Sequence, residues 1–173
     1  MNKLTHDKLS SIRLQAQRRL DLREMSCKQV SQDCSGLNRG AEHLQILCCG
    51  GTGCHASDSR KIVENLRQSI AAHRIENQVD VVATGCFGFC EKGPIVKMIP
   101  DNTFYVQVKP EDAEELVTEH IIGGRRVNRL LYVDPKTSHE VSDSKHMDFY
   151  RKQMRIALRN CGMINPEDIF EYI

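Results

Sequence analysis

The sequence has no tryptophan and few other aromatic residues, with five phenylalanines and four tyrosines among 173 residues. Its core must therefore rest on isoleucine, leucine and valine, which is typical of helices packed on a small sheet. No apolar run approaches the roughly 20 residues that span a bilayer. The N-terminus also lacks the apolar stretch of a signal peptide. We expect a chain without a membrane span that stays in the cytoplasm.

A bias toward charge of one sign is absent as well. Lysine and arginine number 24 against 23 aspartate and glutamate residues, which gives a formal net charge of +1. No run of like charge is long enough for a tail that binds nucleic acid, so we expect no nucleic-acid partner. A length of 173 residues allows one packed domain of ordinary size with extensions at both ends.

The N-terminal extension is predicted to be one helix followed by a linker. After Thr5, a plausible N-cap, apolar residues recur at steps of three and four among arginine, glutamine and lysine, which predicts an amphipathic helix of four or five turns. Residues 26–41 are polar with several small or flexible positions and are interpreted as a linker. We therefore assign residues 1–41 to this helix and linker, with the main domain beginning near Glu42.

Residues 42–124 predict an α/β domain with a thioredoxin-like fold. Two short apolar strands are separated by a helix that Ser57 or Asp58 begins. A hairpin turning at Pro100, Asp101 and Asn102 comes next, and a helix after Pro110 closes the domain. The resulting order β-α-β-β-β-α is the thioredoxin-like arrangement. The predicted strands cover residues 43–49, 79–84, 94–99 and 103–108.

Residues 125–173 form a C-terminal extension whose sequence pattern differs from that of the main domain. An extended strand and a polar turn are predicted first, then a helix over 148–160 and a shorter helix that Pro166 opens. With little apolar surface, this segment is not expected to fold alone. We interpret it as a truncated unit or as a tail that depends on a partner.

Eight cysteines are the most informative feature that the sequence contains. Reducing cytosol disfavours structural disulfides, so metal ligation or redox chemistry is expected. Cys49 and Cys54 bracket GGTG, whereas Cys86 and Cys90 bracket FGF, and both pairs directly follow predicted strands. Strand ends hold side chains firmly, so the four thiolates can converge on a metal centre. Glycines crowd both loops and would let backbone N–H groups approach the sulfur atoms: Gly50, Gly51, Gly53, Gly85, Gly88 and Gly93.

Three kinds of site fit this cysteine pattern. We favour a 2Fe-2S cluster, because a helix and a strand separate the two pairs and glycines surround both. Structural zinc also uses four cysteines in two pairs, and the spacing alone does not exclude it. A redox dithiol or a disulfide is the third alternative, although no pair here has the two intervening residues of a thioredoxin-type motif.

The other cysteines and His55 are not expected to bind the metal centre. Cys48 should point to the opposite face of its strand and pack as a small apolar residue. Cys27 and Cys34 are expected to be free thiols in the linker, and Cys161 a packing residue at a helix end. His55, beside Cys54, is expected to be a partly exposed neighbour of the site.

The cysteine loops also resemble those of a known family. CCGGTGC, GCFGFCEKGPIVKMIP and YVQVKPEDAEELV are similar to the thioredoxin-like 2Fe-2S ferredoxins, a family that includes the small iron-sulfur subunit of respiratory NADH dehydrogenase. The resemblance covers residues 44–122. It implies a 2Fe-2S cluster with Cys49, Cys54, Cys86 and Cys90 as its ligands.

Both ends of the chain resemble a larger protein. LSSIRLQAQRRLDLRE and DFYRKQMRIALRNCGMINPEDIFEYI are similar to the flavin-bearing subunit of NAD(P)-reducing and electron-bifurcating hydrogenases, a relative of NADH dehydrogenase. That resemblance implies an N-terminal cluster module, with FMN and NAD bound only in a downstream domain that this chain lacks. The implied partners are flavin and iron-sulfur domains or subunits of a larger oxidoreductase, with a ferredoxin as a further partner and a homodimer as a further state.

The expected function is one-electron transfer through the cluster, without a catalytic site of its own. A stand-alone 2Fe-2S ferredoxin is the main alternative, and a structural zinc module is the other. Four apolar residues are expected to shield the cluster and to form part of a docking surface: Phe87, Phe89, Ile95 and Val96.

Overall fold

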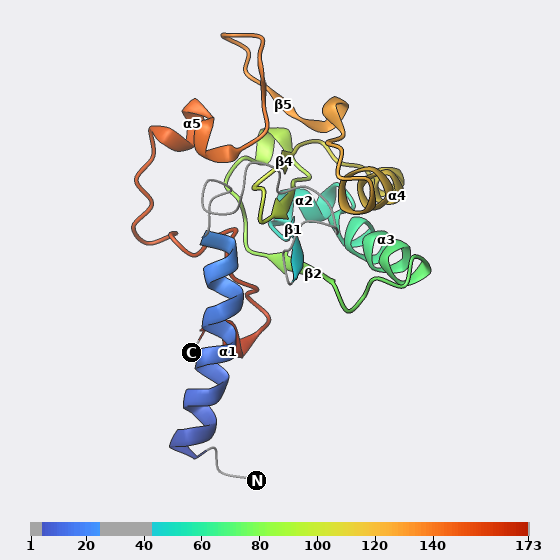
Figure 1. Ribbon diagram of the computed structural model, residues 1–173. Coiled ribbons are helices and arrows are strands. Elements are labelled where there is room, and N and C mark those ends of the chain that lie inside the picture. Colours follow the sequence, from blue (N-terminus) through green and yellow to red (C-terminus); the bar gives the residue numbers. More distant parts are fainter. Residues whose placement is uncertain (1–4, 25–42, 173) are drawn as a thin grey trace.

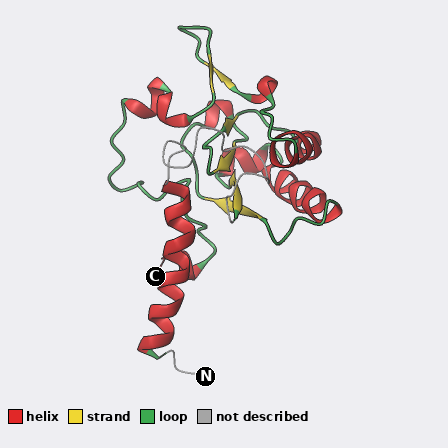
Figure 2. Cartoon of the chain, viewed as in Figure 1, coloured by secondary structure: helices red, strands yellow, loops and turns green. Residues whose placement is uncertain are grey.

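The computed structural model describes residues 5–24 and 43–172. Its central feature is a mixed sheet of four strands in the order β2-β1-β3-β4. The strands are yellow in Figure 2. β1 pairs in parallel with β2 and antiparallel with β3, and β4 pairs antiparallel with β3. The strands are β1 (Leu44–Cys49), β2 (Val79–Thr84), β3 (Val96–Ile99) and β4 (Phe104–Tyr105).

β1 is buried along its whole length because it has a neighbour on each side and packing on both faces. Strand side chains alternate between faces, so neighbouring residues enter different parts of the core. Ile46 and Cys48 join one apolar cluster, whereas Leu47 and Cys49 join a second. One side of β1 therefore packs in the main apolar core, and the other side packs in the cluster next to the cysteine loops.

Helices cover the face of the sheet to which Ile46 and Cys48 belong. α3 (Ser59–Ala72) buries Ile62, Leu66 and Ile70, which are spaced four residues apart and so lie on one side of the helix. α4 (Ala113–Glu115) continues as a wider π-helical turn over Leu116–Ile122, and it packs against α3 (Figure 1). The predicted helix after Pro110 is thus confirmed.

The predicted hairpin is also confirmed, although its second strand is shorter than expected. At the turn, the N–H of Met98 donates a hydrogen bond to the carbonyl of Thr103 at 2.9 Å. On the side of β4 away from β3, the backbone N–H groups of Phe104 and Val106 donate to the carbonyls of Ser142 and Leu130. The outer edge of the hairpin is therefore covered by the C-terminal extension.

The C-terminal extension differs from its prediction. The helix expected over 148–160 is wrong, because α5 ends at Arg151 and residues 152–168 have no helix or strand. Contacts that Tyr150 and Arg155 make with the Phe87 carbonyl hold this segment against the cysteine loops, and they override its helical propensity. The short helix expected near Pro166 begins later. The elements of the extension are β5 (Tyr132–Val133), β6 (Glu140–Val141), α5 (Asp148–Arg151) and α6 (Ile169–Tyr172).

The predicted N-terminal helix is confirmed as α1 (His6–Glu24), and it extends away from the sheet (Figure 1). Its second half packs against α6. Arg23, 2% exposed, makes a bidentate ion pair with Glu171 at 2.7 and 2.8 Å. The Nε of Arg23 also donates to Gln45 in β1 at 2.6 Å. One buried arginine therefore joins both ends of the chain to the central strand. The linker prediction, with Cys27 and Cys34, lies outside the described residues.

This arginine supports a first prediction. Arg23→Ala leaves the buried Glu171 carboxylate without its bidentate partner and with Arg19 at 3.9 Å, and the loss of such a buried partner costs about 3–5 kcal/mol. Because the loss falls on the contact between α1 and α6, we expect α1 to detach while the sheet stays folded. Hydrogen exchange of the α1 amides would measure this, with the exposed Arg18→Ala as the control on the same helix. Equal protection of α1 in both variants would contradict the anchoring role.

The same contact should depend on pH. Burial raises the pKa of Glu171, but hydrogen bonds from Arg23 and from the Asn165 N–H outweigh it, so the pKa lies below its ordinary value. A carboxylate with a lowered folded pKa stabilises the fold above its unfolded pKa, about 4.3, and this contribution is lost as the pH falls through the folded value. Protection of α1 is therefore expected to weaken below about pH 4, after correction for intrinsic exchange rates.

Candidate functional site

The four predicted cysteines lie where strands β1 and β2 end. Cys49 is the last residue of β1, and Cys54 lies in the short helix α2 (Thr52–Ala56) that follows. Cys86 comes two residues after β2, and Cys90 begins a single 3-10 turn over Cys90–Lys92. β1 and β2 are parallel neighbours, so their carboxyl ends meet at the same edge of the sheet. The register aligns Cys49 with Thr84 and thereby brings the two loops together.

The sulfur atoms are arranged as two linked pairs. The Sγ atoms of Cys86 and Cys90 lie 3.8 Å apart. Two thiolates at about 2.3 Å from one tetrahedral metal ion are separated by about 3.8 Å, so this pair has the spacing of shared ligands. Cys49 is hydrogen-bonded to Cys54 and, more weakly, to Cys86. The structure therefore brings together all four residues that the sequence singled out.

Backbone N–H groups converge on these sulfur atoms. The Gly88 N–H donates to the Cys86 Sγ at 3.2 Å, and the N–H groups of Gly51 and Phe87 are directed at Cys49. The Cys54 thiol, with these amides, lowers the pKa of Cys49 to about 6 against the opposing effect of burial. Conversely, the bond to Cys49 and burial raise the pKa of Cys54. Negative charge is thus favoured on the Cys49 sulfur, as a metal-ligating thiolate requires, whereas burial raises the pKa of Cys86.

Two of the predicted glycines lie close to cysteine sulfur atoms. A Cβ atom on Gly93 would lie 2.7 Å from the Cys54 Sγ, and one on Gly51 would lie 3.0 Å from the Cys86 Sγ. The first distance is shorter than side chains tolerate, and the second is tight enough that the Cys86 side chain would have to shift. Gly53, by contrast, has open space beside it, and Gly85 faces Cys161 and Gly162 instead of a sulfur atom. The prediction that glycines allow the backbone to approach the sulfur atoms therefore holds for some of the predicted glycines and not for others.

Cys48, Cys161 and His55 are not among the four cysteines of the site. Cys48 enters the other apolar cluster, and burial raises its pKa to about 12, so it stays a neutral thiol. Its predicted role as a core residue is confirmed. Cys161 is half-buried, and its backbone lies 3.7 Å from where a Cβ of Gly85 would be. His55 is half-buried and accepts a hydrogen bond from Arg60 at 2.9 Å.

Aromatic residues cover the second cysteine loop. Phe87 and Phe89 are only 6% and 7% exposed, respectively. Phe87 packs edge-on against Phe104, with ring centroids 5.7 Å apart, and Phe89 contacts Phe149 at 4.7 Å. Further rings from the extension complete this cover: Tyr132 and Tyr150.

The predicted docking role of four apolar residues is corrected by this packing. Ile95 and Val96 are 1% and 0% exposed, and Phe87 and Phe89 are covered by the extension, so none of them presents a surface. Val96 also pairs with Cys48 and lies in the cluster on the other face. At the sequence level nothing indicated this cover, because Tyr150 and Phe87 are 63 residues apart.

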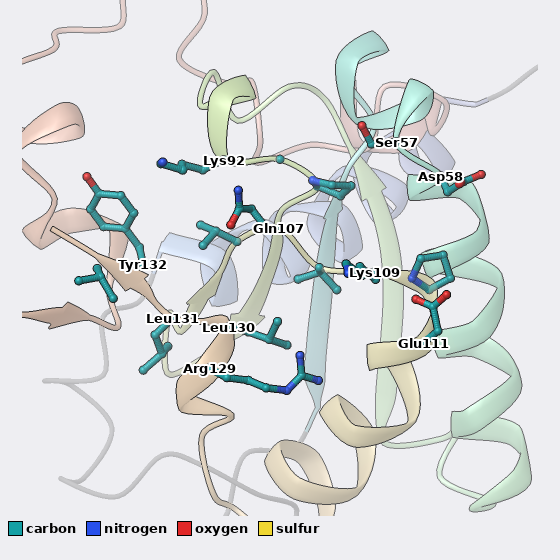
Figure 3. A pocket seen from close by; sticks show the side chains of 16 residues that line it. Ser57, Asp58, Lys92, Gln107, Lys109, Glu111, Arg129, Leu130, Leu131 and Tyr132 are labelled. Atoms are coloured by element: carbon teal, nitrogen blue, oxygen red, sulfur yellow. The ribbon is translucent and has the colours of Figure 1, made fainter. Parts of the chain in front are cut away.

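A groove of about 890 Å³ borders the site (Figure 3). It reaches the cysteine loops through Ser57, Lys92 and Gly93, and its floor is partly apolar. Lys92 pairs with Glu91 at 3.1 Å, and Arg129, also in the lining, pairs with Asp112 at 2.7 Å. The charges around the groove are therefore largely balanced within the protein.

Four cysteines in two pairs are the donor set that a 2Fe-2S cluster uses. Within residues 5–24 and 43–172, no group of three or more histidine, cysteine or acidic side chains is placed to hold one metal ion. A 2Fe-2S cluster contains two irons and four cysteine ligands, so each iron can take one pair of sulfurs. The two cysteine pairs and their directed amides match this requirement. No helix in the described part of the chain is long and apolar enough to cross a membrane.

Comparison with known proteins agrees with this chemistry. Residues 36–120 match the family of thioredoxin-like 2Fe-2S ferredoxins. The chain is 39% identical over 77 residues to a 2Fe-2S ferredoxin of Clostridium pasteurianum, covering 44% of this chain and 76% of the relative. Identity to a 2Fe-2S ferredoxin of Aquifex aeolicus is 35% over 79 residues, which cover 45% and 71%, respectively. A crystal structure of a thioredoxin-like ferredoxin from Aquifex aeolicus is 32% identical with a TM-score of 0.48, covering 52% and 96% of the two chains.

The fold and the cysteine site thus define an iron-sulfur electron carrier of α/β architecture. The chain belongs to the thioredoxin-like 2Fe-2S ferredoxin family. As a member of this family it has the thioredoxin-like fold, carries a 2Fe-2S cluster and transfers electrons, as the sequence predicted.

Proposed function

We propose that Cys49, Cys54, Cys86 and Cys90 hold the cluster, with Cys49 and Cys54 on one iron and Cys86 and Cys90 on the other. The observation that carries this assignment is the convergence of the two pairs at one sheet edge. Its support is the 3.8 Å spacing of the second pair and the amides directed at Cys49 and Cys86.

The cluster, when bound, supplies reversible one-electron chemistry. The protein's own residues hold the thiolates and exclude water from one side of the site, where Phe87 and Phe89 are buried. Cys90 and Gly88 are exposed, so this edge is the shortest path between the sulfur atoms and a redox partner. No substrate-binding or catalytic residue is needed for this task.

We further propose that the domain is the N-terminal module of an NAD(P)H-linked flavin and iron-sulfur oxidoreductase in the cytoplasm, of the kind found in bifurcating hydrogenases. Residues 125–173 would then form the linker and the start of a flavin-binding domain, after an N-terminal helix and linker in 1–41 and the cluster domain in 42–124. The resemblance of both chain ends supports this context. So does the close packing of the extension on the cluster loop.

A stand-alone ferredoxin is the second candidate, because the relatives from Clostridium pasteurianum and Aquifex aeolicus are named as ferredoxins. NADH reduction of the purified, cluster-loaded chain separates the two candidates. As a module, the chain should be reduced by NADH only when a flavin-bearing NADH dehydrogenase subunit is added. Reduction as fast by an unrelated ferredoxin reductase as by that subunit would favour the stand-alone carrier. Iron and sulfide counts and the EPR signal of the reduced protein establish loading in both assays.

A further inference from the structure

The peptide group between Phe87 and Gly88 receives two hydrogen bonds from the C-terminal extension. The Nη2 of Arg155 donates to the Phe87 carbonyl at 2.6 Å, and the Oη of Tyr150 donates to the same oxygen at 3.1 Å. The Arg155 guanidinium also lies over the Tyr150 ring, 5.1 Å from its centroid. Both residues lie beyond residue 120, where the match to the ferredoxin family ends.

The other end of the same peptide group faces a sulfur atom. The C=O of Phe87 and the N–H of Gly88 belong to one planar, conjugated unit. That N–H donates to the Cys86 Sγ at 3.2 Å. A cation at the oxygen draws electron density from the nitrogen and makes the N–H a stronger donor, since hydrogen bonds in a chain polarise one another. Arg155 is therefore connected to Cys86 through a single peptide group.

The surroundings preserve this connection. Phe87 is buried, so water has little access to compete for its carbonyl. Burial raises the pKa of Tyr150, which keeps its phenol protonated and able to donate. Gly88 has a φ of +79°, and a Cβ there would lie 2.7 Å from the Arg155 Nη2. Only glycine at this position allows the guanidinium to approach the peptide group so closely.

We propose that Arg155, assisted by Tyr150, is a positioning residue that raises the reduction potential of the cluster through the Phe87–Gly88 peptide group. The inference rests on the proposed ligand role of Cys86. Reduction adds one electron, delivered by the redox partner, and increases the negative charge on the cluster and its sulfur ligands. A stronger N–H donor stabilises that added charge, so the reduced state is favoured.

The test is an EPR-monitored redox titration of the full chain with Arg155→Gln, Tyr150→Phe and Arg159→Gln. Arg155→Gln is expected to lower the equilibrium constant for reduction about tenfold, which is 59 mV for a one-electron couple. Tyr150→Phe removes the second donor without a change in charge and should lower the potential by less. The exposed Arg159→Gln removes an equal charge from the same segment and should leave the potential nearly unchanged. Arg155→Lys should restore part of the loss.

Each outcome decides for or against the inference. Unchanged potentials in both the Arg155→Gln and Tyr150→Phe proteins, with full iron and sulfide content, would overturn it. An equal drop in Arg159→Gln would also overturn it, because general charge would then be the cause. If Arg155→Gln fails to load, Tyr150→Phe decides alone. Cys86→Ser tests the ligand set separately, since an unchanged EPR spectrum in that variant would refute the proposed function itself.

Discussion

Cys54→Ala is expected to abolish the 2Fe-2S cluster, so the purified protein should lose its visible absorption and nearly all its iron and sulfide. The residue is the main hydrogen-bonding partner of Cys49, and its sulfur lies against Gly93. Without it, one iron keeps a single cysteine from its proposed pair. Iron and sulfide counts per chain after anaerobic purification would measure the loss.

Cys48, the neighbour of Cys49 in β1, provides a matched control for the Cys54→Ala variant. Cys48 is as buried as Cys54, at 1% against 2% exposure, but its side chain enters the opposite apolar cluster. Cys48→Ala should therefore keep the full cluster and lower the free energy of unfolding by roughly 1 kcal/mol, as for other small deletions in a core. Loss of iron from the Cys48→Ala protein, or retention by the Cys54→Ala protein, would refute the assignment.

Gly93→Ala is expected to remove most of the cluster although no sulfur atom is changed. The new methyl group would lie 2.7 Å from the Cys54 Sγ and 3.4 Å from the Cys90 carbonyl oxygen, so the sulfur or the loop must move. A ligand displaced by even a fraction of an ångström no longer meets the geometry that a metal centre demands. Cluster content and the shape of the EPR signal would both report this displacement.

Gly53→Ala is the appropriate control, because it makes the same change next to Cys54, in the first cysteine loop, without meeting any atom within 4 Å. We expect it to retain a normal cluster. If both glycine variants lose iron equally, the cause would be loop flexibility rather than the contact with Cys54. If neither does, the close approach at Gly93 would not constrain the site.

Much of the site was predictable because it depends on local sequence. Each cysteine pair lies within one short loop, and each loop follows an apolar strand, so the positions of Cys49 and Cys86 could be inferred from hydrophobic pattern alone. The role of Cys48 followed from strand alternation in the same way. The proposed division of the two pairs between the irons could not be inferred from the sequence, because it depends on contacts between the sulfur atoms in the folded chain.

The cover over the second loop could not be predicted because it depends on contacts between distant residues. Residues 148–160 have the composition of a helix, yet only α5 is helical, since Tyr150 and Arg155 gain more from a carbonyl far away in the chain. The buried arginine of α1 was missed for a similar reason. The periodicity of α1 indicated an apolar stripe, whereas the most deeply buried contact of this helix is the ion pair between Arg23 and Glu171.

Cys49, a proposed cluster ligand, lies at the end of the fully buried, doubly paired strand β1, and that position has a consequence for the speed of electron transfer. A metal centre that gains an electron tends to lengthen its bonds, and the surrounding nuclei must readjust before the transfer is complete. Here that readjustment is resisted by ladder hydrogen bonds on both flanks of the strand. A small nuclear rearrangement lowers the activation barrier for each hop, so the stiffness of the sheet favours rapid exchange with whichever partner approaches the exposed edge.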